Sequence, residues 1–258
     1  AITGTLEVGS AQSNPTVAPS KSLSKSLSES TNVTLGHGTL DGCGLSIGDV
    51  AREAGAFVVH YSTDYVFFGD LDRPYREDDP TGPLNTYGES KREGEIRLAE
   101  SGAEYYLFRT AWVISSRGHN FLRTILRLAA ERDRLQVVSD QVGAPTSAAL
   151  IADVTAHALH QRLAGRTSAE MGGIYHLSAS GAASWHEVAR YIVEAASTLG
   201  FDLRLSAEQI EPIRAADYGQ AAPRPGNSRL DTSRLTEQFG LTLPDWRDGI
   251  HWALEQLR

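Results

Sequence analysis

From Leu45 to the C-terminus, short runs of apolar β-branched and aromatic residues alternate with segments of helical periodicity. The strand-like runs are "AFVVHYS", "EYYLFRTAWVIS", "RLQVVSDQ" and "GGIYHLSAS", and each is followed by helix-like sequence. Short apolar runs of this kind are typical of strands that are buried on both faces of a parallel sheet. Since strands alternate with helices along the chain, the sequence predicts an α/β fold with a largely parallel sheet.

The composition divides the chain into three parts. Residues 1–45 contain the serine-rich near-repeat "KSLSKSLSES", which cannot bury enough apolar area to offset its ordering entropy, so this head is expected to be disordered or truncated. Residues 46–182 are expected to form an α/β domain. Residues 183–258 contain the helix-like "SWHEVARYIVEAASTLG" and "LPDWRDGIHWALEQL", and they are expected to form a smaller lobe.

The bulk properties narrow the range of partners. A formal net charge of −8 argues against nucleic acid or an anionic membrane as the main partner. No apolar run approaches the roughly 20 residues that a membrane span needs. The single cysteine, Cys43, excludes an internal disulfide, and together with the lack of a signal-peptide pattern it favours the cytoplasm.

Several kinds of chemistry lack a motif in this chain. The eight histidines show no metal-type spacing, and there is no paired cysteine, H-E-x-x-H or G-x-S-x-G. His60 and His176 lie inside predicted strands, where a hydrogen-bonding core histidine is the better interpretation. We therefore expect no metal site and no serine or zinc hydrolase.

Lys91, in "NTYGESKREGE", is the only lysine after residue 30, and it lies four residues after Tyr87. On a helix these two side chains share one face, about 5–6 Å apart at Cβ. A nearby ammonium is expected to lower the pKa of the phenol, which suits proton transfer to a carbonyl or from an alcohol. A compact ammonium can also bond ribose hydroxyls, which a planar guanidinium does not replace. The alternative is a solvated helix face with a chance pair.

The motif "STDYVF" places Ser62, Thr63 and Asp64 at the end of a predicted strand. In open parallel sheets, ligands bind outside the carboxyl ends of the strands. A hydroxyl there can hydrogen-bond the same substrate oxygen that Tyr87 protonates. This juxtaposition indicates a carbonyl-reducing or alcohol-oxidising site.

Three further residues have two interpretations each. Trp112 follows the strand "YYLFRTA" and is either a core residue or a platform for a sugar or base. Arg224 and Arg229, in "PRPGNSRL", either grip a diphosphate or are surface arginines.

Seven motifs occur in one order: "HYSTDYVF", "PLNTYGESKREGE", "FRTAWV", "DQVGAPT", "GIYHLSASG", "PRPGNSRLDTSRL" and "LPDWRDGI". From about Ala51 to the C-terminus, the sequence resembles the dTDP-4-dehydrorhamnose reductase family of extended short-chain dehydrogenases/reductases. The resemblance implies a Rossmann-like, doubly wound parallel sheet, with residues 46–182 as the nucleotide-binding domain and residues 183–258 as a smaller C-terminal substrate-binding lobe. It also implies NADPH- or NADH-dependent reduction of the 4-keto group of dTDP-4-dehydro-6-deoxy-L-mannose, a dTDP-linked 4-keto-6-deoxysugar, to dTDP-L-rhamnose.

The same resemblance implies a role for each candidate residue. The catalytic triad would be Thr63, Tyr87 and Lys91. The nicotinamide cofactor would contact Tyr61, Tyr87 and Lys91. The sugar nucleotide would contact Thr63, Asp64, Trp112, Arg224 and Arg229.

The chain departs from the family pattern before "STDYVF", where a G-x-x-G-x-x-G fingerprint and further βα units are expected. The nearest candidate is "VTLGHGTLDGCG", in which Gly36 and Gly38 would open a phosphate loop; the alternative is a flexible turn. Three explanations stay open. A frameshift or deletion has removed this part, the residues skip stretches of the chain, or the protein binds no dinucleotide.

Two other functions therefore stay open beside the reductase. One is a reductase of a related nucleotide sugar. The other is a non-enzymatic regulatory subunit resembling the β subunit of methionine adenosyltransferase, which the missing fingerprint favours and the intact triad does not. The preference between NADH and NADPH, homodimerisation and any divalent-ion requirement cannot be read from this sequence.

Overall fold

The computed structural model describes residues 33–34, 46–167, 171–219 and 222–258. The prediction of a disordered or truncated head at residues 1–45 lies outside the described residues, apart from Val33–Thr34. The candidate phosphate loop at Gly36 and Gly38 also lies outside them.

A four-stranded parallel sheet forms the centre of the fold, and its strand order is β1-β2-β3-β8. The strands are β1 (Val33–Thr34), β2 (Val58–Thr63), β3 (Tyr105–Thr110) and β8 (Gly173–His176). Thr63 pairs with Thr110 in the register of β2 and β3, so these two strands end at the same level. The predicted α/β fold with a parallel sheet is confirmed.

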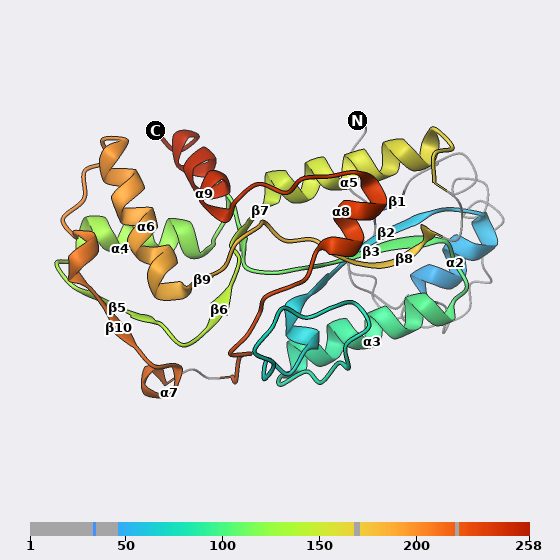
Figure 1. Cartoon of the computed structure of the whole chain (residues 1–258), viewed down its shortest axis with the longest axis horizontal. Helices are drawn as coiled ribbons and strands as arrows, with labels where there is room; N and C mark the ends of the chain where they lie inside the picture. The colour runs from blue at the N-terminus through green and yellow to red at the C-terminus, as the bar shows by residue number, and fades with distance from the viewer. Residues whose placement is uncertain (1–32, 35–45, 168–170, 220–221) are drawn as a thin grey trace, which may run out of the picture.

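Helices cover both faces of this sheet (Figure 1). Helices α5 (Ala148–Leu163) and α8 (Ser233–Phe239) lie on one face, and α2 (Ile47–Ala54) and α3 (Thr86–Glu100) lie on the other. Successive strand residues point to opposite faces, and two separate apolar clusters result. The cluster under α5 and α8 includes Val59, Tyr106, Phe108 and Tyr175, and the one under α2 and α3 includes Val58 and Leu107.

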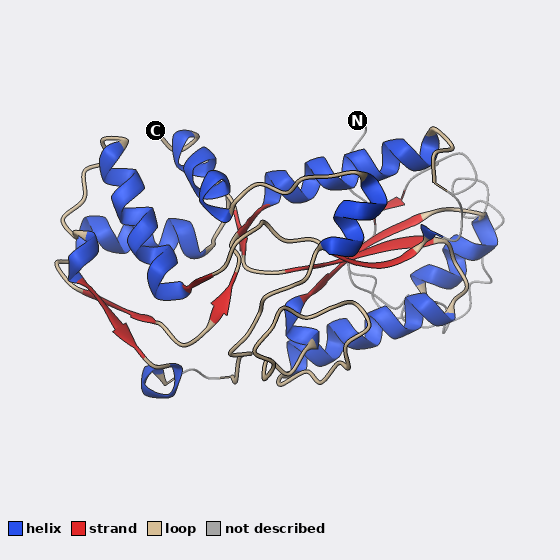
Figure 2. Ribbon diagram, in the orientation of Figure 1, coloured by secondary structure: helices blue, strands red, loops and turns tan. Residues whose placement is uncertain are grey.

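A second group of elements lies beside the sheet, at the left of Figure 2. It contains α4 (Phe121–Glu131), α6 (Trp185–Thr198) and α9 (Trp246–Glu255), together with β5 (Leu135–Val138) and β10 (Ile210–Ile213). Strand β5 pairs in parallel with β10 and not with the central sheet. The strand predicted in "RLQVVSDQ" is therefore confirmed, and its pairing partner comes from far along the chain.

The expected boundary between residues 182 and 183 stays a prediction. Apolar residues of α4 and β5, which precede it, share one cluster with residues of α6 and α9, which follow it. Segments from both sides of that boundary thus build the smaller group of elements.

The remaining elements are short. They are η1 (Asp64–Val66), β4 (Val113–Ile114), β6 (Val142–Gly143), β7 (Thr146–Ser147), β9 (Ala183–Ser184), η3 (Ala207–Gln209) and α7 (Ala215–Tyr218). Within the described ranges, no helix is both long and apolar enough to cross a membrane.

Candidate active site

Helix α3 begins against the turn that follows β2. Asn85 caps the helix by accepting a hydrogen bond from the Gly88 backbone N–H at 2.9 Å. A Cβ at Gly88 would lie 2.2 Å from the Tyr65 carbonyl oxygen, so only glycine allows this close approach. The approach brings Tyr87 beside the turn, where its ring packs edge-on against Tyr65 with the centroids 5.8 Å apart.

Thr63 and Tyr87 meet at the carboxyl end of β2. Thr63 is the last residue of the strand and is buried. Its side chain lies near enough to Tyr87 to lower the pKa of that phenol, and its hydroxyl donates to Asp64 Oδ1 at 3.0 Å. The Tyr87 ring is 53% exposed. The predicted pair of hydroxyls thus shares one location, and it remains accessible to a ligand.

Lys91 lies one turn along α3 from Tyr87 and is buried. Its Nζ donates to the Tyr61 carbonyl oxygen at 3.3 Å and lies 5.9 Å from the centroid of the Tyr87 ring. Burial lowers the pKa of Lys91, and the Glu95 carboxylate opposes that effect. The ammonium is therefore held at the carboxyl edge of the sheet and not in bulk solvent.

The pKa of Tyr87 is raised, whereas the sequence suggested a lowered one. Desolvation is the largest cause, and the Asp64 carboxylate adds to it, while the hydrogen bond with Thr63 acts in the opposite direction. The prediction of a lowered phenol pKa is wrong for this structure, because desolvation of the phenol is the largest cause and raises its pKa. A raised pKa keeps Tyr87 protonated near neutral pH.

Asp64 is a buried carboxyl beside these hydroxyls. Desolvation raises the pKa of Asp64 to about 6, and hydrogen bonds from the Ser228 and Thr63 side chains reduce the shift. Ser228 belongs to "PRPGNSRL", so the structure brings that motif to "STDYVF". Three buried polar atoms here have no hydrogen-bond partner among the described residues: Ser62 Oγ, Asp64 Oδ2 and Thr110 Oγ1. Such atoms are characteristic of a site that receives a polar ligand.

Trp112 is held in an unusual conformation just beyond β3. Its φ is +48°, in the left-handed region that non-glycine residues rarely adopt. Its ring stacks on Trp185, with the centroids 3.5 Å apart and the planes 10° from parallel. Gly143 lies against the Trp112 ring, since a Cβ there would be 2.6 Å from a ring carbon. The sugar contact proposed for Trp112 stays a prediction, and Trp185 occupies its stacking position.

A cavity of about 400 Å³ lies in the smaller group of elements. Its lining includes Phe121, Val138, Trp185, Tyr218 and Arg224. The lining therefore combines aromatic rings with one guanidinium, a combination that suits a base or sugar carrying phosphate groups. The sequence analysis did not single out Trp185, because no spacing rule connects it with Trp112.

The two candidate arginines have different surroundings. Arg224 is exposed and lines the cavity. Desolvation and the Asp64 charge raise the pKa of Tyr65 to about 12, and the Arg224 charge opposes that shift, so Arg224 is also near Tyr65. Arg229 donates through Nε to Asn227 Oδ1 at 2.8 Å and through Nη2 to the Asp72 carbonyl. Arg229 thus holds two loops together, and its contact with substrate stays a prediction.

Tyr61 reaches the site through its backbone. Its hydroxyl is 2.9 Å from Thr155 Oγ1 of α5, while its carbonyl accepts from Lys91. The structure therefore gathers Thr63, Asp64, Tyr87 and Lys91 in one place, with Tyr61 next to them.

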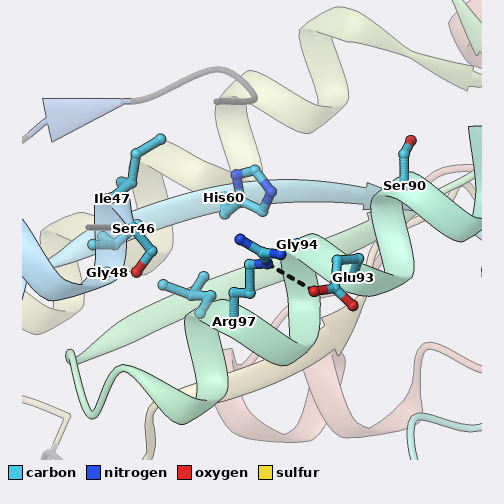
Figure 3. Close-up of a pocket in the computed structure, with 10 residues that line it drawn as sticks. Ser46, Ile47, Gly48, His60, Ser90, Glu93, Gly94 and Arg97 are labelled. Carbon is cyan, nitrogen blue, oxygen red and sulfur yellow. Dashed lines mark hydrogen bonds and ion pairs between the residues drawn. The ribbon is translucent and has the colours of Figure 1, made fainter. Parts of the chain in front are cut away.

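Other polar features are separate from this place. A hollow of about 280 Å³ between α2 and α3, shown in Figure 3, contains none of the predicted site residues. His176 is fully buried and its Nδ1 lies 3.0 Å from the Tyr75 carbonyl oxygen, as expected for a core histidine. No cluster of three metal-ligating side chains occurs among the residues that the structure describes.

Residues 43–258 match the model of the RmlD substrate binding domain family. The chain belongs to this family. It is 47% identical over 215 residues to the dTDP-4-dehydrorhamnose reductase of Shigella flexneri, covering 83% of this chain and 70% of that protein. It is 46% identical over 212 residues to the enzyme of the same name from Escherichia coli K12, covering 82% and 69%.

Solved structures of the family have the same fold. The dTDP-4-dehydrorhamnose reductase of Bacillus anthracis, in complex with NADP, superposes with a TM-score of 0.72 at 32% identity, covering 81% of this chain and 69% of that one. The predicted resemblance and the Rossmann-like fold are confirmed.

Proposed function

We propose that this chain reduces the 4-keto group of dTDP-4-dehydro-6-deoxy-L-mannose to dTDP-L-rhamnose with NADPH or NADH. The observation that carries the proposal is the Tyr87 side chain beside the Thr63 hydroxyl at the end of β2, with the Lys91 Nζ 5.9 Å from the centroid of the Tyr87 ring. Membership of the family and the names of its curated relatives support it.

The described residues fit a nicotinamide cofactor. The buried Lys91 ammonium and the unpartnered hydroxyls of Ser62 and Thr110 lie at the carboxyl end of the sheet, where such ligands bind in open α/β folds. Lys91 would hold the ribose, and the backbone around Tyr61 would lie beside the ring. When bound, the cofactor supplies the hydride.

Tyr87, Thr63 and Lys91 would each have a different role in the proton transfer. Tyr87 is protonated near neutral pH because its pKa is raised, so it can donate a proton to the developing alkoxide. The Thr63 hydroxyl hydrogen-bonds the same oxygen and stabilises its charge. The Lys91 ammonium then stabilises the phenolate that remains on Tyr87.

The sugar nucleotide would extend from this end of the sheet towards the cavity. Trp185 and Tyr218 offer aromatic surfaces for its base, and Arg224 offers a guanidinium for the diphosphate. Asp64, Trp112 and Arg229 complete the predicted substrate residues. The absence of a nucleic-acid partner and a cytoplasmic location remain predictions from the sequence, which leaves homodimerisation open.

The proposal is tested by following nicotinamide fluorescence while the chain is mixed with NADPH or NADH and the 4-keto sugar nucleotide. We expect oxidation of the cofactor and formation of dTDP-L-rhamnose. In Tyr87→Phe, turnover should fall by about 10²–10⁴-fold because the proton donor is lost, while sugar-nucleotide binding stays near that of the wild type.

Tyr65→Phe is the matched control, since it removes the hydroxyl of the neighbouring ring and should retain turnover. Binding of the sugar nucleotide without oxidation of either cofactor would contradict the reductase and favour the regulatory role. A loss of less than about tenfold in Tyr87→Phe would contradict the role given to Tyr87.

A further inference from the structure

Glu95 lies one helical turn beyond Lys91 on α3, on the side that faces the sheet. It is 2% exposed, and its two carboxylate oxygens accept from Arg109 of β3. The distances are 2.9 Å from Arg109 Nε to Oε1 and 2.7 Å from Nη2 to Oε2. This bidentate geometry fixes both side chains with respect to each other.

Further contacts determine the position of Arg109. Its Nη1 donates to the Glu77 carbonyl oxygen at 3.2 Å, and its guanidinium lies 5.0 Å from the centre of the Phe67 ring. The Glu77 carboxylate in turn accepts from the His176 backbone N–H of β8 at 2.8 Å. The Glu95 carboxylate is therefore held from both β3 and the loop before α3, and it cannot relax towards solvent.

Stability alone does not account for this pair. Burying two charges costs as much as, or more than, their attraction returns, and apolar replacements of similar volume are often neutral or stabilising. The next buried residue along the same side of α3 is Leu98, which packs on the sheet without any charge. A leucine or methionine at position 95 would thus satisfy the packing, so the carboxylate has another role.

Lys91 is the group on which that carboxylate acts. The Lys91 Nζ contacts the Tyr61 carbonyl oxygen and the Tyr87 ring, and Glu95 lies one turn further along the buried side of α3. Charged groups on the elements packed against this side of α3 include Asp64 after β2 and Arg109 of β3. Glu95 is the charged group that favours the ammonium against its burial. The Arg109 guanidinium donates its hydrogen bonds to both Glu95 carboxylate oxygens and to the Glu77 carbonyl oxygen.

We propose that Glu95 is a positioning residue of this active site: clamped by Arg109, its carboxylate keeps the buried Lys91 ammonium charged and fixes the helix that carries Tyr87. The role of Glu95 in catalysis rests on the proposed function. The electrostatic part does not, because it concerns Lys91 in the protein without substrate or cofactor.

The test is a direct titration of Lys91. The chain contains three lysines, Lys21, Lys25 and Lys91, so labelling with ¹³Cε-lysine gives three side-chain signals. The signal missing from Lys91→Arg assigns Lys91. Its chemical shift is then followed from neutral to alkaline pH in the wild type and in variants of Glu95.

In Glu95→Gln, we expect the pKa of Lys91 to fall below its wild-type value, because the carboxylate is lost and Arg109 is left uncompensated. The alkaline limb of kcat/KM should move to lower pH by the same amount. Glu93→Gln is the matched control: Glu93 is on the same helix but exposed, and it pairs with Arg97 in Figure 3. The Lys91 titration should be unchanged there.

A double variant, Glu95→Leu with Arg109→Met, separates charge from packing. It replaces the pair with apolar side chains, so the fold should be retained even if Glu95→Gln unfolds. We expect the pKa of Lys91 in the double variant to lie below the wild-type value. In a separate Glu95→Asp variant, which keeps a carboxylate, the pKa of Lys91 should lie closer to the wild-type value. An unchanged Lys91 titration in the folded double variant would overturn the proposal. A lowered Lys91 pKa without any reductase activity would uphold it and refute the proposed function.

Discussion

Helix α3 carries two rows of polar residues, and the members of each row are four residues apart. The inner row consists of Tyr87, Lys91 and Glu95. The outer row consists of Glu89, Glu93 and Arg97. Lys91 and Glu95 are buried, and Tyr87 lies at the exposed end of the inner row, whereas all three residues of the outer row are exposed.

The two rows show that spacing alone does not decide what a side chain does. Glu93 and Arg97 form an ion pair of 2.7 Å, as short as the pair between Glu95 and Arg109. The outer pair is about half exposed at both partners, where water and salt screen it. In the inner row, burial lowers the pKa of Lys91.

The largest predicted effect concerns Asp64, which faces the inner row and raises the pKa of Tyr87. Its own pKa is raised from 3.8 to about 6, so the folded state binds the proton more tightly than the unfolded state does. Folding stability is then lost as pH rises through this window, by about 3 kcal/mol in all. Asp64→Asn should therefore unfold at higher denaturant concentration than the wild type at pH 7.

Denaturant titrations between pH 4 and pH 8 check this. The advantage of Asp64→Asn should shrink as pH falls from about 6 to about 4, while turnover is reduced because a predicted substrate contact is altered. A stability difference that does not depend on pH would show that the carboxyl is not titrating in the fold.

Lys91→Arg is expected to have a smaller effect, on function and not on folding. A planar guanidinium keeps the charge but cannot present three donors from one compact point in the space that Lys91 fills. We expect weaker NADPH binding and a turnover about tenfold lower, equivalent to about 1.4 kcal/mol of transition-state stabilisation. Fluorescence titration and steady-state kinetics measure the two effects.

Arg97→Lys, in the outer row, is the matched control for Lys91→Arg and should bind and turn over like the wild type. If Lys91→Arg also retained full activity and cofactor affinity, the inner row would not differ from the outer row in its effect on function.

The smallest effect is expected at Glu93. Glu93→Gln removes an exposed i, i+4 pair, and such pairs contribute about 0.3–0.5 kcal/mol. Thermal and chemical unfolding should place the variant within about 0.5 kcal/mol of the wild type. A destabilisation of several kcal/mol would mean that the outer row contributes to the fold in a way that its exposure does not suggest.

The sequence predicts the local parts of this site well. Helix α3, the strand before it and the Tyr87–Lys91 spacing all follow from short-range patterns, and Gly55 ends α2 in a left-handed conformation, as expected. The proximity of Thr63 to Tyr87 was also predictable, since residues at the carboxyl ends of parallel strands lie near ligands.

The non-local parts could not be read from patterns. Strand β5 pairs with β10, which is about 75 residues later, and no local rule identifies that partner. The raised pKa of Tyr87 depends on desolvation and on Asp64, neither of which has a sequence signature. The stacking of Trp112 on Trp185 likewise needs the fold to be known.

The segment of residues 223–231 hydrogen-bonds residues that come much earlier in the chain. Asn85, at the start of α3, donates through Nδ2 to the Pro223 carbonyl at 2.9 Å, across 138 residues of chain. Asn227 Nδ2 donates to the carbonyls of Leu71 and Arg73, and Ser228 reaches Asp64. The surroundings of helix α3 are therefore incomplete until residues 223–231 have been synthesised and have packed against it.

This ordering has a consequence during protein synthesis. A ribosome that adds roughly 5–20 residues per second takes roughly 7–28 s to pass from Asn85 to Pro223. For that time the nascent chain has made Thr63, Tyr87 and Lys91 but lacks the segment that closes around them. A growing chain therefore lacks the hydrogen bonds from Asn85 to Pro223 and from Asn227 to Leu71 and Arg73 until residues 223–231 have been made.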